Sequence, residues 1–298
     1  MIDHNLIMRC EDLMATLDHE HVRVVDCRFS LTDPKAGRAQ YLAGHIPNAV
    51  YADLDNDLAA PVGPATGRHP LPDVDVFSAT MGRLGISRET HIIAYDQASG
   101  ALAARLWWLL RWAGHDKVSL LDGGIARWQT LQLPLEMGQH EVAECRFVPE
   151  LRPELVVDTG EISAALPNIS ALGLVDAREA ERFRGIAEPI DPVAGHIPGA
   201  RNVPFASSLQ EDGCWENAET LRGKWQDELG DALGAPWCVM CGSGVTACHL
   251  IVSALLAGLP EPRLYVGSWS EWIRDPDRPV SRDRDGDALL PPNHAEGT

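Results

Sequence analysis

Short apolar runs rich in β-branched residues alternate along the chain with longer stretches in which apolar residues recur at helical spacing. The runs at 22–25, 92–95 and 118–121 predict strands, and the amphipathic stretch at 101–113 predicts a helix. Such alternation favours a parallel sheet, because parallel strands need a crossover connection and a helix supplies it. The pattern therefore predicts an α/β fold.

The same pattern occurs twice. Four segments of the first half return in the second half in the same order, at offsets of 144 to 151 residues. The matched pairs are VVDCR (24–28) and LVDAR (174–178), GHIPNAV (44–50) and GHIPGAR (195–201), HIIAYDQASG (91–100) and WCVMCGSG (237–244), and LLDGGIARW (120–128) and LYVGSWSEW (264–272). Their order and spacing indicate a tandem duplication of about 120 to 130 residues per copy.

We predict two α/β domains, each with a central, mainly parallel sheet flanked by helices. The first copy is assigned to residues 1–136 and the second to residues 159–284. Residues 137–158 match neither copy and contain two prolines, so they are predicted to be a linker. The charged, unpatterned residues 285–298 are predicted to be a frayed tail.

Charge, apolar content and cysteine use restrict the ligands and the cellular location that the sequence favours. The chain has 25 Lys and Arg against 43 Asp and Glu, a net charge of −18, which disfavours nucleic acid as a ligand. We expect no membrane span, because no apolar stretch approaches the roughly 20 residues that a span needs. Seven scattered cysteines and the lack of a secretory signal pattern favour reduced thiols and a cytoplasmic location.

Cys241 carries the strongest chemical signal in the sequence. It follows the apolar run WCVM and precedes Gly-Ser-Gly-Val-Thr, after which residues 247–256 are predicted to form a helix. Two glycines permit a tight loop with converging amides, and a thiolate there is stabilised by the N–H groups and by the helix dipole. The first copy has Asp96 at the matching position, so only the second copy keeps a nucleophile.

The remaining cysteines give weaker signals. Cys238 and Cys241 form a C-x-x-C pair, as in redox dithiols and zinc sites, but both would lie on one strand and no second such pair exists. We therefore expect no metal and no cofactor. The cysteines assigned to packing are Cys10, Cys27, Cys145, Cys214 and Cys248.

Taken together, these motifs resemble tandem rhodanese-domain sulfurtransferases over residues 5–282. The stretch C-G-S-G-V-T at 241–246 is similar to the active loop of the 3-mercaptopyruvate sulfurtransferases. The resemblance implies an inactive first copy and a catalytic Cys241. This cysteine would take a sulfane sulfur from a small anionic donor as a persulfide and pass it to a thiol, cyanide or thioredoxin-like acceptor.

The resemblance also implies residues that bind the donor. Arg182 matches the arginine that holds the donor carboxylate or sulfonate. The loop residues that would contact the donor are Gly242, Ser243, Gly244, Val245 and Thr246. The family's relay would join Ser243 to His45 of the first GHIP motif and to an acid, for which Asp33 is the nearest candidate. Arg68 and His69, in the stretch TGRHPLP, receive no predicted role.

Two departures from the family pattern bear on the donor. A second arginine is expected in an E-P-R stretch, where this chain has Glu188, Pro189 and Ile190; Arg178 and Arg184 are candidates to replace it. Enzymes that prefer thiosulfate also lack that arginine, but carry Arg-Lys in place of the Gly-Ser that follows Cys241 here. The loop favours 3-mercaptopyruvate, with thiosulfate as the alternative.

Two rival functions remain to be compared. Cysteine phosphatases need an arginine six residues after the cysteine, and Ala247 stands there. A non-catalytic persulfide relay module would keep Cys241 but would turn over small donors at a negligible rate. A rate assay with both donors separates this module from an enzyme.

Overall fold

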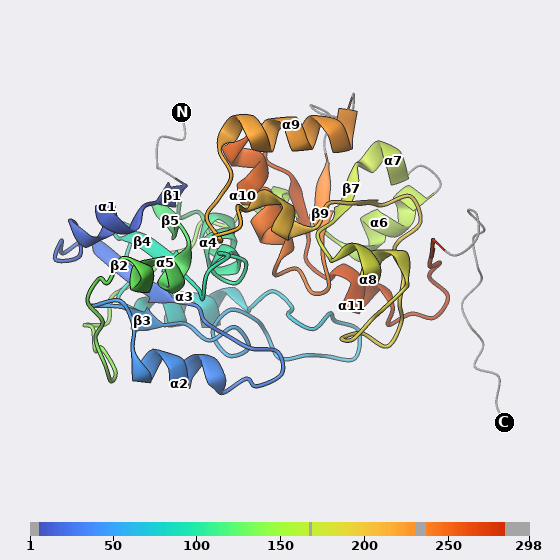
Figure 1. Cartoon of the computed structure of the whole chain (residues 1–298). Helices are drawn as coiled ribbons and strands as arrows, with labels where there is room; N and C mark the ends of the chain where they lie inside the picture. The colour runs from blue at the N-terminus through green and yellow to red at the C-terminus, as the bar shows by residue number, and fades with distance from the viewer. Residues whose placement is uncertain (1–5, 167–168, 231–236, 284–298) are drawn as a thin grey trace. The chain divides into compact units, whose positions relative to one another are not determined.

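The computed structural model describes residues 6–166, 169–230 and 237–283 (Figure 1). They form two compact units, and each unit contains one five-stranded parallel sheet with helices on its faces. The predicted α/β fold with two parallel sheets is thereby confirmed. The predicted tail at 285–298 lies outside the described residues.

The two sheets have the same strand order. It is β1-β5-β4-β2-β3 in unit 1 and β6-β10-β9-β7-β8 in unit 2, so each strand has a counterpart at the same place. The strands of unit 1 are β1 (Ile7–Met8), β2 (Val22–Asp26), β3 (Val50–Tyr51), β4 (His91–Tyr95) and β5 (Val118–Leu121). Those of unit 2 are β6 (Val156–Val157), β7 (Leu174–Asp176), β8 (Arg201–Asn202), β9 (Cys238–Met240) and β10 (Arg263–Tyr265).

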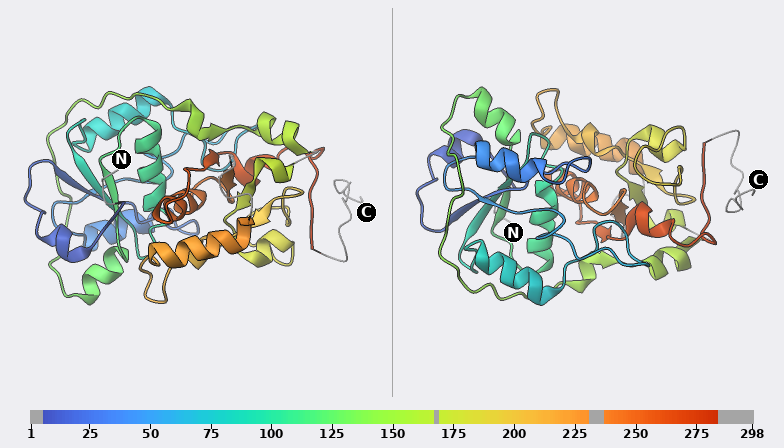
Figure 2. Two further views of the ribbon diagram at one scale, coloured as in Figure 1. Left: turned by 90° about the horizontal axis from the view of Figure 1, so that it is seen from above. Right: turned by 90° about the horizontal axis from the view of Figure 1, so that it is seen from below.

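Helices cover both faces of the sheet in unit 1. One core cluster joins α1, α2 and α5 to β2, β4 and β5, while α3 and α4 lie on the opposite face (Figure 2). Because both faces are covered, neighbouring residues inside the strands are apolar and buried together, as Val24 and Val25 are in β2 and Ile92, Ile93 and Ala94 are in β4. The helices are α1 (Cys10–Met14), α2 (Ala36–Ala43), α3 (Val74–Arg83), α4 (Ala103–Trp112) and α5 (Gly124–Thr130).

Unit 2 repeats this arrangement. Residues of α6, α7 and α11 join the strands in one core cluster, and α10 packs against both β9 and α9. The helices are α6 (Thr159–Ala165), α7 (Ile169–Leu172), α8 (Ala180–Arg184), α9 (Ala218–Leu229), α10 (Ala247–Leu256) and α11 (Ser268–Trp272). Two short 3-10 helices are η1 (Pro153–Leu155) and η3 (Phe205–Ser208).

The units are not continuous in sequence. Among the described residues, unit 1 comprises 6–61, 71–153 and 208–216, and unit 2 comprises 62–70, 154–207 and 217–283. Each unit thus includes a short segment from the sequence range of the other copy. The residues predicted as a linker run along unit 1 and then supply β6, the edge strand of the second sheet.

The repeated V-D-x-R and GHIP motifs hold the fold together. In unit 2, the buried guanidinium of Arg178 donates to both carboxylate oxygens of Asp176 and, at 2.7 Å, to the carbonyl oxygen of Gly195. The same contacts recur in unit 1 among Asp26, Arg28 and Gly44. The pair therefore ties the end of a central strand to the GHIP turn in both copies.

The GHIP histidines also make matching contacts. The ring of His45 stacks on Tyr41, and its Nδ1 lies 2.8 Å from the Tyr41 carbonyl oxygen. His196 stacks on Phe183 in the same way, with Nδ1 2.8 Å from the Phe183 carbonyl oxygen, and burial lowers its pKa. Since both copies make these contacts, the GHIP histidines hold a turn.

Candidate active site at the Cys241 loop

Cys241 directly follows β9, and its backbone is held by the start of α11. The Cys241 N–H donates to Ser268 Oγ at 3.1 Å, and the Cys241 carbonyl accepts from the Trp269 N–H at 3.0 Å. The next carbonyl, that of Gly242, accepts from the Ser270 N–H at 2.9 Å. The side chain of Cys241 is buried, with 2% of its residue surface exposed. The loop is therefore anchored on the helix that follows the neighbouring strand β10.

The two glycines of the loop have different surroundings. Gly244 has a φ of 74°, and a Cβ there would lie 2.5 Å from the carbonyl oxygen of Val266. A side chain at Gly242 would instead meet two guanidinium groups, because its Cβ would lie 3.1 Å from Arg68 Nη2 and 3.5 Å from Arg182 Nη2. Gly242 thus borders a cationic site.

Several amides of the loop have no hydrogen-bond acceptor among the described residues. Helix α10 begins directly after the loop, and its N-cap residue, Thr246, makes no side-chain capping bond. The N–H groups without an acceptor in the described part of the chain include those of Ser243, Val245 and Ala247. Orphan N–H groups at a helix N-terminus attract an anion.

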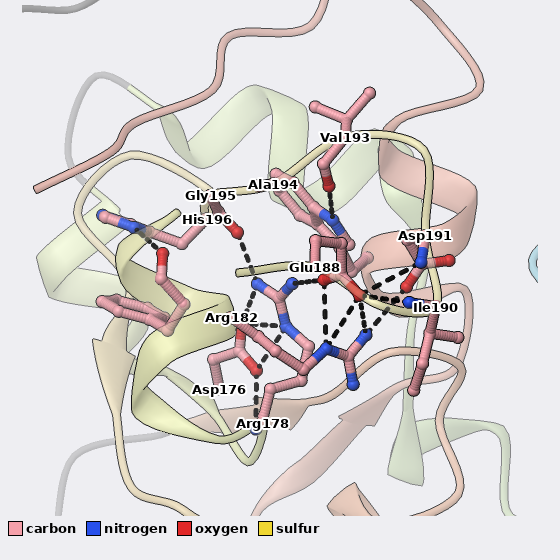
Figure 3. A network of polar contacts seen from close by, with 12 residues as sticks. Asp176, Arg178, Arg182, Glu188, Ile190, Asp191, Val193, Ala194, Gly195 and His196 are labelled. Carbon is pink, nitrogen blue, oxygen red and sulfur yellow. Dashed lines mark hydrogen bonds and ion pairs between the residues drawn. The ribbon is translucent and has the colours of Figure 1, made fainter. Parts of the chain in front are cut away.

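Arg182 lies in a network of buried carboxylates (Figure 3). Its Nε donates to Glu188 at 2.9 Å, and its Nη2 donates to Asp191 at 3.0 Å. Burial alone would raise the pKa of Glu188, but the hydrogen bonds from Arg182 and from the amides of Ile190 and Asp191 lower it. Arg182 therefore lies beside Gly242 of the loop, with its charge balanced by two carboxylates.

Neither candidate for the missing second arginine reaches the loop. Arg178 is committed to Asp176, Glu188 and the Gly195 carbonyl (Figure 3), and its side chain is fully buried. Arg184 is more than half exposed and pairs with Asp283. Both predictions are wrong, because the fold uses one residue internally and leaves the other at the surface.

Segment 62–70 brings two further residues to the loop. The Nη1 of Arg68 donates to Asp191 at 2.5 Å, and Nδ1 of His69 lies 2.8 Å from Ser243 Oγ. His69 and Ser243 are both buried. The sequence analysis assigned neither residue a role, because the stretch TGRHPLP gives no indication that it packs in the second unit.

The histidine bonded to Ser243 is therefore His69 and not His45. The predicted relay joined Ser243 to His45, but the His45 ring holds the first GHIP turn against Tyr41. Asp33, the predicted acid, is exposed, and its carboxylate accepts from the nearby Lys35 N–H. The structure therefore brings His69, and not His45 or Asp33, to the hydroxyl of Ser243.

Five other cysteines have thiols with a raised pKa. Burial raises the pKa of Cys238, three residues earlier, to about 12, and that of Cys10 to about 11. Burial also raises the pKa of Cys27, Cys145 and Cys214. These thiols stay protonated at neutral pH, so they are poor nucleophiles.

The described residues offer neither a metal-binding cluster nor a membrane-spanning helix. They contain no group of three or more His, Cys, Asp or Glu side chains arranged to hold a metal ion. No helix in the described part of the chain is long and apolar enough to cross a membrane.

Comparisons with known proteins agree with the duplicated fold. The model of the rhodanese-like domain matches residues 10–131 and 159–275. A Pseudomonas aeruginosa protein named a probable 3-mercaptopyruvate sulfurtransferase is 44% identical over 285 residues, 92% of this chain and 97% of that protein. A Mycobacterium tuberculosis protein, provisionally named the thiosulfate sulfurtransferase SseB, is 40% identical over 262 residues, 88% of this chain and 91% of that protein.

A solved structure has the same fold over nearly its whole length. The crystal structure of Escherichia coli SseA, described as a 3-mercaptopyruvate sulfotransferase with the rhodanese fold, aligns with a TM-score of 0.79 at 33% identity. The alignment covers 89% of this chain and 99% of SseA. With two domain matches and relatives that align along most of their length, the chain belongs to the family of proteins built from rhodanese-like domains.

Proposed function

We propose that the protein is a sulfurtransferase that moves sulfur from 3-mercaptopyruvate through a persulfide on Cys241 to a thiol or cyanide acceptor. One observation carries the proposal: Cys241 stands before loop amides that have no acceptor among the described residues, beside a hydrogen-bonded Ser243 and His69. The names of the Pseudomonas aeruginosa and Escherichia coli relatives support the same donor.

In the first step, the Cys241 thiolate attacks the sulfur of 3-mercaptopyruvate. A sulfur–sulfur bond forms and the carbon–sulfur bond breaks, and its electron pair leaves with the carbon as the pyruvate enolate. Protonation of the enolate gives pyruvate. The outer sulfur of the persulfide at first keeps the proton of the donor thiol, and once that proton is lost the loop amides stabilise the negative charge on this sulfur.

Ser243 and His69 are suited to supply the proton that the enolate takes up. The serine hydroxyl is a weak acid, but a protonated His69, whose Nδ1 lies 2.8 Å from Ser243 Oγ, would replace the proton that the serine gives up and become a neutral imidazole. In the second step an acceptor thiolate attacks the outer sulfur. The sulfur leaves with the acceptor, and the Cys241 thiolate is restored.

Thiosulfate is the second candidate donor. It would transfer its outer sulfur to Cys241 with sulfite as the leaving group. The Mycobacterium tuberculosis relative is provisionally named for this donor, and this chain lacks the arginine of the E-P-R stretch. The glycine and serine after Cys241 favour 3-mercaptopyruvate, because neither supplies the cations found there in enzymes that prefer thiosulfate.

The deciding experiment measures turnover of both donors in parallel and the mass of the protein after exposure to each. We expect turnover that is faster with 3-mercaptopyruvate, and a mass gain of about 32 Da on the peptide that contains Cys241. A Cys241→Ser variant should show neither. A label on Cys238 or Cys248 would contradict the assignment, and a label without turnover would favour a persulfide relay module.

Arg182 provides a second test. Replacing Arg182 by alanine removes a charge-assisted contact with an anionic donor, so kcat/KM should fall by the equivalent of about 2 to 4 kcal/mol. An unchanged kcat/KM would exclude Arg182 from donor binding.

We also propose a reduced, cytosol-like compartment, in keeping with seven free cysteines.

A further inference from the structure

The second arginine that the sequence lacks at Ile190 has a spatial substitute. Ile190 has a side chain that is 44% exposed, and only its backbone N–H reaches the network, where it donates to Glu188. Arg68 approaches the same carboxylates from segment 62–70. It binds Asp191 through one oxygen, while Arg182 binds Asp191 through the other.

Only part of the hydrogen-bonding capacity of Arg68 is used within the described residues. Its Nη1 is bonded to Asp191, but its Nε is buried with no partner in the described residues, and Nη2 has no acceptor there either. The side chain is 25% exposed, so a ligand can reach it. Arg68 therefore has more donors than the surrounding protein satisfies.

The two guanidinium groups converge beside Cys241. Both Arg68 Nη2 and Arg182 Nη2 lie within 3.5 Å of the point that a Cβ on Gly242 would occupy. Arg68 thus fills the space that a side chain at Gly242 would need. Asp191 holds the two cations together, and its carboxylate is almost fully buried.

The backbone of segment 62–70 is built to hold Arg68 at this point. A Cβ on Gly67 would lie 2.5 Å from the carbonyl oxygen of Gly267, the N-cap of α11. Only glycine at position 67 therefore lets the segment approach α11 this closely. The Arg68 N–H donates to Ser270 Oγ at 2.9 Å. Because α11 also anchors Cys241 and Gly242, Arg68 is fixed relative to the nucleophile.

We propose that Arg68 and Arg182, joined by Asp191, form a clamp for the carboxylate of the donor, and that Arg68 supplies the cation missing at Ile190. The ligand class is a small 2-oxo carboxylate bearing a thiol. This inference rests on the proposed function for its substrate, but the presence of an anion site beside Cys241 can be tested without it.

The first test compares two alkylating reagents on Cys241. Iodoacetate carries a carboxylate and iodoacetamide is its neutral counterpart, so the ratio of their rates, followed by peptide mass, reports the local cation. We expect Arg68→Met to lower the iodoacetate rate about tenfold or more relative to iodoacetamide. Arg184→Met, which removes an exposed arginine, should leave the ratio unchanged.

The Arg68→Gln variant separates the loss of charge from a structural change in segment 62–70. Glutamine can still donate to Asp191 but carries no charge, so the segment keeps its anchor. A lowered ratio in both Arg68 variants supports the clamp. An unchanged ratio in a folded variant overturns it, as does an equal slowing of both reagents, which would indicate a displaced loop.

Steady-state kinetics then connect the clamp to the reaction. Arg68→Met should raise KM for 3-mercaptopyruvate by about 10- to 100-fold with a smaller change in kcat, and Arg68→Lys should recover part of the loss. A KM unchanged in Arg68→Met would overturn the clamp. If the wild-type protein formed no persulfide with this donor, the proposed function would fail, while the alkylation ratio would still decide the role of Arg68.

Discussion

The loop after β4 in unit 1 and the loop after β9 in unit 2 occupy matching positions in their sheets but have different side chains at the first loop residue. In unit 1, the carboxylate of Asp96 accepts four backbone N–H groups, from Ala98, Gly100, Leu102 and Ala103. In unit 2, Cys241 stands at the matching position. The counterparts of the first three amides, those of Ser243, Val245 and Ala247, have no acceptor among the described residues.

The comparison explains what the loop is built to hold. A carboxylate oxygen of Asp96 is two bonds beyond Cβ, and so is the outer sulfur of a cysteine persulfide. Asp96 therefore shows that an anion at this distance from the backbone can reach the amides. Burial raises the pKa of Asp96, and its four N–H donors act against that shift. In unit 1 the carboxylate of Asp96 occupies the anion site. We infer that in unit 2 the matching site binds the outer sulfur of the Cys241 persulfide.

The largest expected effect comes from making the two loops alike. In Cys241→Asp the new carboxylate should accept the loop amides as Asp96 does, and sulfur transfer should be lost entirely, because no nucleophile remains. The urea concentration at which this variant unfolds should be at least as high as that of Cys241→Ser, which lacks the anion. A carboxylate variant less stable than the serine variant by more than about 1 kcal/mol would contradict the shared geometry.

The reciprocal change tests the other loop. Asp96→Cys should lower the free energy of unfolding by about 3 kcal/mol, because four buried N–H groups lose their acceptor. In a Cys241→Ser background it should restore no transfer, since Ala98 stands where the hydroxyl of Ser243 would be. Asp18→Cys, at an exposed position, is the matched control and should have little effect on stability.

A smaller effect is expected from the serine and histidine that only unit 2 possesses. Ser243→Ala should lower kcat with 3-mercaptopyruvate about 100-fold, because the enolate loses its proton donor. His69→Gln should lower kcat by a similar factor. The double variant should be little worse than either single one, since the two residues act as a unit. Fully additive losses would show that Ser243 and His69 work independently.

The smallest effect concerns stability in acid. Glu188 has a pKa below its ordinary value of 4.5 in the folded protein, so its stabilising contribution is present above that value and is lost as the pH falls through the lowered pKa. Glu188→Gln should therefore be less stable than wild type by about 2 kcal/mol near neutral pH, and the difference should vanish in strong acid. Urea unfolding across this pH range measures it.

A matched control sharpens this last prediction. Glu20 is 86% exposed, so the stability difference between wild type and Glu20→Gln should stay small at every pH. A Glu188→Gln difference that stayed constant into strong acid would mean that the lost contribution is packing and not ionic.

The fold and the position of Cys241 could be predicted because their signals are local or repeated. Apolar runs mark the buried parallel strands, and the loop glycines show their constraint in the sequence itself. The contacts of Arg68 and His69 could not be predicted in this way. His69 meets Ser243 across 174 residues, and nothing in the pattern of segment 62–70 indicates that it packs in the second unit.

The predicted relay partner His45 lies in a motif that both copies contain. GHIP occurs in both copies and makes the same turn contacts in both, whereas Cys241 occurs in one copy only. Catalytic partners of Cys241 are therefore better sought among residues that lack a counterpart. Arg68 and His69 meet that criterion, and His45 does not.

The exchange of segments between the units restricts the possible history of the protein. Once segment 62–70 had become part of unit 2, a shortened gene encoding the second copy alone would have lost Arg68 and His69 along with the first copy. A first copy that has Asp96 in place of the loop cysteine is then retained for the segment that it contributes to unit 2. Duplication of this kind is hard to reverse, and the two halves must be inherited as one piece.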